Sequence, residues 1–80
     1  MPKQPVISGK KLVKALTKLG YQVIRQRGSH ITLHKTRESE KHTITIPLHK
    51  ELAEGTLNDI LSKVALWNRL TKEELFELMK

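Results

Sequence analysis

A six-residue segment combines two basic side chains, a flexible glycine, a hydroxyl and an imidazole. It reads R-Q-R-G-S-H and covers Arg25–His30, between two short runs of strand-forming residues. Arginine forks onto two phosphate oxygens at once, and histidine transfers protons near neutral pH more readily than other side chains. The segment therefore predicts chemistry on a phosphodiester. His30 is the candidate catalytic residue, and Arg25, Arg27 and Ser29 are candidates for binding the nucleic-acid backbone.

Other chemistries fit the same residues less well. His30 and His34 have the spacing of a zinc motif, but in a strand they would lie about 13 Å apart, too far to share one ion. A nucleophilic Ser29 would lack an acidic partner for its base, because residues 1–37 contain no Asp or Glu. The chain has no GxxxxGK[ST] phosphate loop, which excludes a P-loop NTPase. We therefore expect no metal ion and no cofactor.

A lone histidine among cations is sufficient for one class of reaction, the cleavage of RNA by its own 2′-hydroxyl. The RNA supplies the nucleophile, so the protein needs only a group that moves protons and cations that stabilise the transition-state charge. The alternative is that His30 is an exposed strand residue without a special role. The residues alone favour neither interpretation.

Positive charge is concentrated in the first half of the chain. Residues 1–37 contain nine Lys and Arg and no acidic residue, whereas residues 38–80 contain six basic and eight acidic residues. Such asymmetry favours a polyanionic partner, either a nucleic acid or an acidic protein surface. We expect Lys11, Lys14 and Lys18, on the polar side of a predicted helix, to contact RNA. For each lysine taken alone, a solvated helix face is the simpler interpretation.

The totals indicate one small intracellular domain. The 80 residues can form a single core but not a deep pocket. The chain has no cysteine, which excludes disulfides and thiolate metal sites and suits a reducing cytosol. No apolar run resembles a signal peptide or a membrane span. We therefore expect a single-domain cytoplasmic protein over residues 1–80 that does not bind a membrane.

Hydrophobic periodicity predicts one helix and then a small sheet. Ser8 is a suitable N-cap for a helix over residues 9–19, which follows a loose arm over residues 1–7 and stops at Gly20. Alternating residues then predict three antiparallel strands that are joined by hairpins. The strands and their connections are residues 21–25, a turn at Gly28–Ser29, residues 30–35, a polar loop over 36–41, and residues 42–46 followed by Pro47.

The last part of the chain predicts two more helices. Residues 48–54 form a loop, and Thr56 is a candidate N-cap for a helix over residues 57–65. Trp67 and Leu70 fall in a connector. Thr71 and Glu74 have the spacing of a capping box, which begins a short helix over about residues 71–79 with an apolar edge formed by Leu75, Leu78 and Met79. The order α-β-β-β-α-α predicts an α+β fold with helices on one face of a three-stranded antiparallel sheet.

Four segments, in this order and spacing, resemble the HicA family of bacterial toxin–antitoxin systems. They are Ser8–Tyr21, Arg25–His30, Ile46–His49 and Glu54–Leu61, and the resemblance covers about residues 7–66. It implies a fold like the double-stranded-RNA-binding domain. It also implies an mRNA interferase, that is, a ribosome-independent and metal-independent endoribonuclease that cleaves mRNA and is held silent by a HicB-type antitoxin.

The resemblance also assigns roles to single residues. The family's single catalytic histidine lies in a G-S-H motif, which maps onto Gly28, Ser29 and His30, and the family's G-T-L helix opening maps onto Gly55–Leu57. It assigns no role to the other three histidines or to the tail after residue 66. Two alternatives remain open: an RNA-binding module that recognises shape and phosphates without cleavage, and a protein whose basic face docks an acidic partner. The G-S-H motif favours the enzyme.

Overall fold

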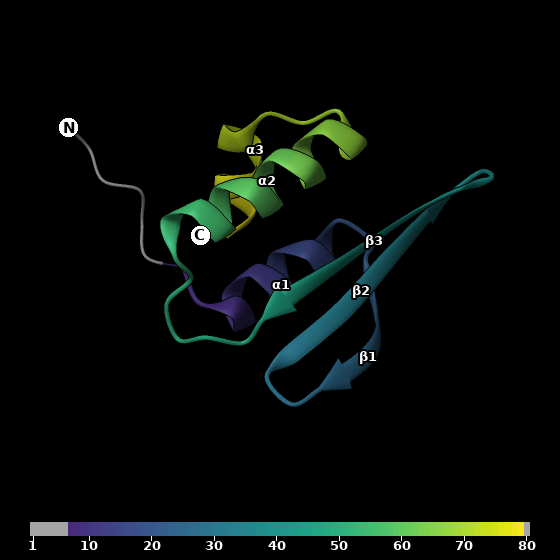
Figure 1. The fold of residues 1–80 in the computed structure, drawn as a ribbon. Coiled ribbons are helices and arrows are strands. Elements are labelled where there is room, and N and C mark those ends of the chain that lie inside the picture. The colour runs from purple at the N-terminus through teal and green to yellow at the C-terminus, as the bar shows by residue number, and fades with distance from the viewer. Residues whose placement is uncertain (1–6, 80) are drawn as a thin grey trace.

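The computed structural model describes residues 7–79 and has the predicted α+β architecture. Its elements are α1 (Gly9–Lys18), β1 (Gln22–Arg27), β2 (His30–Arg37), β3 (Glu40–Pro47), α2 (Glu54–Asn68) and α3 (Lys72–Leu78). The strands form one antiparallel sheet in the order β1-β2-β3, and the helices lie on one side of it (Figure 1). Among the described residues, no helix has both the length and the apolar character that crossing a membrane requires.

A single apolar layer between the helices and the sheet forms the core. The fully buried side chains are Leu33 and Ile46 from the sheet, Leu12 and Leu16 from α1, and Leu57, Leu61 and Val64 from α2. Each such side chain stabilises the fold by about 1.5–3 kcal/mol relative to an exposed position. The buried residues of β2 and β3 all lie on the helix side, and no layer formed by residues 7–79 covers the other face of the sheet.

The first helix begins at the predicted residue and ends at Lys18, one residue before the predicted end, and its start lies against the end of β3. The Lys11 N–H donates to the Ser8 hydroxyl at 3.1 Å, and Gly20 follows the helix with a φ of +102°. Gly9 packs so closely on Pro47 that a Cβ at this position would collide with the Pro47 carbonyl oxygen. This approach fixes the chain after β3 against α1.

Two predictions around the sheet were wrong. The polar loop over residues 36–41 is a two-residue turn at Glu38–Ser39, because Arg37 and Glu40 still pair in the ladder and form an ion pair at 3.0 Å. Ile7 was expected in a loose arm but is buried, and its carbonyl accepts the Leu52 N–H at 2.9 Å. The rest of that predicted arm, residues 1–6, lies outside the described residues.

The second helix is longer than predicted at both ends. It begins at Glu54 after Ala53, so Thr56 lies inside the first turn and is not its N-cap. It continues through Trp67, which was expected in a connector, and it ends where Arg69 adopts a left-handed φ of 57°. Tertiary contacts of Trp67 and Asn68, described below, stabilise this last turn.

The third helix agrees with its predicted start. The Glu74 N–H donates to the Thr71 hydroxyl at 3.1 Å and the Thr71 N–H donates to the Glu74 carboxylate at 3.0 Å, which is a complete capping box. Leu75 and Met79 are buried, and Leu78 packs against the core. The apolar edge of this helix therefore extends the core beyond α2.

Candidate active site

The turn between β1 and β2 presents the G-S-H segment at one end of the sheet. Gly28 has a φ of +56°, whereas Ser29 does not have a positive φ, which is the pattern of a type II′ hairpin turn with glycine at its first central position. Nothing lies within 4 Å of the place where a Gly28 Cβ would be. The turn therefore leaves open space beside Gly28, two residues before His30, which is the first residue of β2.

The ladder brings His30 and two arginines together on the uncovered face of the sheet. Arg27 lies directly opposite His30, and Arg25 lies opposite Thr32. Opposite residues on one face have Cβ atoms about 4.5–5.5 Å apart. Because Leu33 points toward the helices, alternation along β2 places His30 and Thr32 on the other face. His30, Arg25 and Arg27 are all exposed to solvent.

A β-bulge in β1 gives both arginines this orientation. Val23 pairs with Leu33, but the next pair is Arg25 with Thr32, so Ile24 is an extra residue in the ladder. Without it, Arg25 would follow Val23 by two positions and would share its side of the sheet. The bulge therefore turns Arg25 and Arg27 to the uncovered face. The strand-forming character of this run predicted a strand but contained no signal for the bulge.

The uncovered face is basic and carries several hydroxyl groups. The described residues that the ladder places on it include no acidic side chain: Gln22, Arg25, Arg27, His30, Thr32, His34, Thr36, Lys41, Thr43, Thr45 and Pro47. The Thr32 and Thr45 hydroxyls lie 3.2 Å apart and form a hydrogen bond. Chemically, this surface can hold phosphate oxygens with guanidinium groups while an imidazole moves a proton beside them.

The first-helix lysines lie on a different surface. With Lys10, Ser8 and two residues at the end of α3, the residues Lys11, Lys14 and Lys18 line a hollow of about 550 Å³. The Lys18 ammonium also donates to the Leu78 carbonyl at 3.3 Å. Since α1 covers the helix side of the sheet, these lysines are not brought to the face that carries His30 (Figure 1). The predicted RNA contacts thus divide into two groups.

A large part of the sequence matches a known family. The family described as "HicA toxin of bacterial toxin-antitoxin" matches residues 9–66. The chain belongs to the HicA toxin family. The matched region runs from the first residue of α1 to residue 66 of α2 and so includes the whole sheet and the turn before His30. No curated protein and no solved structure matches the chain.

The other histidines of this HicA-family chain have separate surroundings. His34 lies on the face of His30, four residues farther along β2, and its Nδ1 atom is buried without a hydrogen-bond partner. His49 is exposed in the loop after β3. Among residues 7–79, no group of three or more His, Cys, Asp or Glu residues is placed to hold a metal ion.

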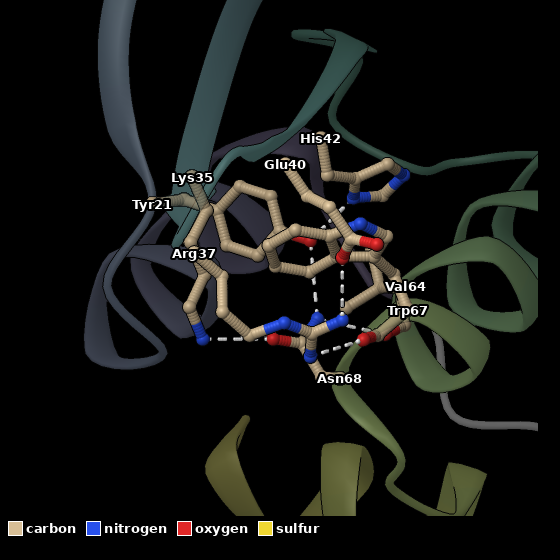
Figure 2. Close-up of polar contacts among 8 residues, drawn as sticks. All are labelled: Tyr21, Lys35, Arg37, Glu40, His42, Val64, Trp67 and Asn68. Carbon is tan, nitrogen blue, oxygen red and sulfur yellow. Dashed lines mark hydrogen bonds and ion pairs between the residues drawn. The ribbon is translucent and has the colours of Figure 1, made fainter.

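The fourth histidine, His42, belongs to a polar cluster at the far end of the β2–β3 hairpin. Figure 2 shows its hydroxyl and amide contacts: the Tyr21 hydroxyl lies 2.6 Å from His42 Nδ1, Asn68 Nδ2 donates to the Tyr21 oxygen at 3.1 Å, and the Lys35 ammonium donates to Asn68 Oδ1 at 2.8 Å. Burial raises the pKa of Tyr21. Burial, together with the charge of Lys63, lowers the pKa of His42. A hydrogen bond thus joins the Tyr21 hydroxyl to His42 in this arrangement.

Trp67 joins the same cluster from the last turn of α2. Its ring stacks on His42 with the ring centroids 5.3 Å apart, and the Arg37 guanidinium lies 4.3 Å from the Trp67 ring centroid. Arg37 also donates to the Trp67 carbonyl at 2.9 Å (Figure 2). The cluster therefore ties the hairpin to α2, at the opposite end of β2 from His30. No sequence motif indicated it, because its members come from four separate segments.

Proposed function

We propose that this HicA-family toxin is an endoribonuclease in which His30 is the general base. The observation that supports the proposal most directly is the pairing of His30 with Arg27 on an exposed sheet face, with Arg25 paired to the next residue on that face. Arginine forks onto the non-bridging oxygens of a phosphodiester, and such contacts strengthen as charge develops in the transition state. The family's role in toxin–antitoxin systems agrees with an activity that harms the cell.

In the proposed reaction the RNA provides its own nucleophile. The His30 imidazole removes the proton of the 2′-hydroxyl, and the 2′-oxygen then attacks the adjacent phosphorus. Arg25 and Arg27 hold the phosphate and balance its added charge, so the reaction needs no metal ion or cofactor. DNA lacks the 2′-hydroxyl and is not a substrate. The uncovered face is an open surface and not a pocket, which suits a flexible single strand such as mRNA better than a small molecule.

The lysines of α1 have a separate part in this proposal. They lie on the helix side, so Lys11, Lys14 and Lys18 bind stretches of a long RNA that extend beyond the cleaved phosphodiester. Contacts of this kind are electrostatic and independent of sequence. They raise the affinity for long transcripts without contributing to the chemical step.

The proposed partner is a HicB-type antitoxin protein that silences the toxin. No described helix or loop covers the face of His30, so inhibition has to come from another chain. Acidic side chains placed against Arg25 and Arg27 would speed association through long-range attraction. Apolar contacts would then slow dissociation.

The test is cleavage of purified RNA by the purified protein, without ribosomes and with EDTA present. We expect RNA to be cut and DNA of the same sequence to remain intact. His30→Ala should lower the cleavage rate by at least about 100-fold, the usual loss when a general base is removed, while RNA binding persists. His34→Ala is the matched control on the same face. RNA binding without cleavage would instead favour a non-catalytic RNA-binding module.

A further inference from the structure

Two threonine hydroxyls meet on the uncovered face of the sheet, beside the row that contains His30. Thr32 of β2 lies directly opposite Thr45 of β3, and their hydroxyl oxygens are 3.2 Å apart. The neighbours of Thr45 along its strand, Ile44 and Ile46, are buried on the helix side, so alternation places the Thr45 side chain on the other face. These two residues, the hydroxyl pair, therefore share a face with the candidate catalytic histidine.

The hydroxyl pair lies about one nucleotide away from the proposed site of cleavage. Thr32 follows His30 by two positions along β2, which separates the two side chains by about 6.6 Å. Neighbouring nucleotides of an extended RNA strand are separated by a similar distance. When Arg25 and Arg27 hold the cleaved phosphate beside His30, the sugar of an adjacent nucleotide therefore comes to the hydroxyl pair.

The hydroxyl pair differs from the cations of this face in the ligands that it can bind. Guanidinium and ammonium groups only donate hydrogen bonds, whereas a hydroxyl both donates and accepts. The bond between Thr32 and Thr45 uses one of their two hydroxyl protons. The second proton and the unused lone pairs remain, so the pair can donate to a ligand and also accept from it. A ribose 2′-hydroxyl has the same double character, whereas a phosphate oxygen only accepts.

We infer that Thr32 and Thr45 bind the 2′-hydroxyl of the nucleotide next to the cleaved one. The inference rests on the proposed RNA cleavage, and it makes the two threonines specificity-determining residues that take no part in proton transfer. Their contact fixes the adjacent sugar and so holds the cleaved phosphate in position beside His30. The protein then reads RNA at two successive sugars, one of which supplies the nucleophile and the other a binding group. A strand that lacks the second hydroxyl is a poorer substrate, even though its cleaved nucleotide is intact.

The experiment compares three oligonucleotides with the sequence of a site that the intact chain cuts. One is all RNA, and the other two have a single 2′-deoxynucleotide on the 5′ side or on the 3′ side of the cleaved nucleotide. Gels that resolve single nucleotides measure kcat/KM for cutting at the shared site. The proteins are the intact chain, Thr32→Val, Thr45→Val and the matched control Thr43→Val, which removes an exposed hydroxyl from the same face of β3. Valine suits a strand, and circular dichroism checks the folding of each variant.

We expect one of the two deoxy substitutions to slow the intact chain about three- to tenfold, the range of one net hydrogen bond. Thr32→Val and Thr45→Val should be slowed to a similar extent on the all-RNA strand, and the same deoxy substitution should then have no further effect on them. Thr43→Val should behave like the intact chain on all three strands. A purely structural role of the threonines would slow all three strands equally and would leave the sensitivity to the deoxy substitution unchanged.

Two results would overturn the role of the hydroxyl pair alone. In the first, neither deoxy substitution slows the intact chain. In the second, Thr32→Val and Thr45→Val remain as sensitive to the deoxy substitution as the intact chain. If the intact chain cuts no all-RNA strand, or if His30→Ala cuts it at a normal rate, the proposed function fails and the inference fails with it.

Discussion

At the scale of single residues, the candidate site depends on where one extra residue stands in an edge strand. Ile24 interrupts the ladder, and the two arginines after it face away from the helices as a result. Bulges at sheet edges commonly redirect side chains near active sites. The bulge also makes the edge of β1 irregular, which hinders pairing with a strand of another molecule. Such protection is useful here because the apolar side chains of Val23 and Ile24 are each 48% exposed.

The separation of the two basic surfaces gives a prediction that depends on RNA length. Binding to single strands weakens with salt at a log–log slope of about −0.7 for each neutralised phosphate. Arg27→Ala should therefore flatten the slope by about 0.7 for short and long RNA alike. Lys14→Ala should flatten it only for RNA long enough to reach the helix side. Fluorescence anisotropy with oligonucleotides of increasing length measures both slopes.

The control for this series is Lys63→Ala, which removes an α2 lysine that pairs with Asp59 at 3.0 Å. Its slope should match that of the intact chain at every length. If Lys14→Ala flattens the slope for the shortest RNA as strongly as Arg27→Ala does, both surfaces contact the same few nucleotides. The division of the RNA contacts into two groups would then be wrong.

At the scale of elements, the polar cluster holds the hairpin of β2 and β3 against the end of α2. Asn68 is its central member, since its amide donates to Tyr21 and to the Val64 carbonyl and accepts from Lys35. The stacked ring of Trp67 and the guanidinium of Arg37 enclose the same side of the cluster. This arrangement explains why α2 continues to residue 68 and does not end near residue 65.

We expect Asn68→Ala to lower the free energy of unfolding by about 2 kcal/mol, because it removes the three hydrogen bonds of the Asn68 amide and leaves the Lys35 ammonium without this acceptor. Urea denaturation measures the change. Ser62→Ala, an exposed substitution in the same helix, should stay within about 0.5 kcal/mol of the intact chain. The folded Asn68→Ala protein should still cleave RNA at a normal rate, because the cluster lies at the other end of β2. A loss of cleavage in the folded variant would mean that the two ends of the sheet are coupled.

At the scale of the whole molecule, the protein carries a net charge of +7 and presents its catalytic candidate on an open surface. The helices all pack on one face of the sheet, and no element within residues 7–79 lies over the other face (Figure 1). This openness agrees with the proposal that another chain controls the toxin. The family's place in toxin–antitoxin systems agrees with such control.

The antitoxin proposal predicts where protection should appear. In a complex with a HicB-type antitoxin, amide hydrogen exchange should slow across residues 25–34, and RNA cleavage should stop. Residues 72–78 of α3, on the helix side, serve as the internal control and should exchange as in the free toxin. High salt should slow association, because charge attraction acts mainly on the encounter. If residues 25–34 stay open while cleavage is inhibited, the antitoxin acts by distorting the site and not by covering it.

Much of the fold follows from local sequence patterns. The Ser8 cap, the G-S turn before His30 and the Thr71–Glu74 capping box each depend on residues no more than three positions apart. The order of elements follows from hydrophobic periodicity, which is also local. The resemblance to the HicA family, carried by four short segments, agrees with the family match over residues 9–66.

Only the tertiary structure decided which of the candidate catalytic and RNA-binding residues lie close together. Strand register brought Arg27 beside His30, while helix packing moved the α1 lysines to another surface. The bulge at Ile24 and the extension of α2 through Trp67 likewise depend on contacts between distant segments. The physical reason is that a one-residue change in register moves every following side chain to the other face. Local periodicity does not determine the register, because the register is set by pairing and packing between distant segments.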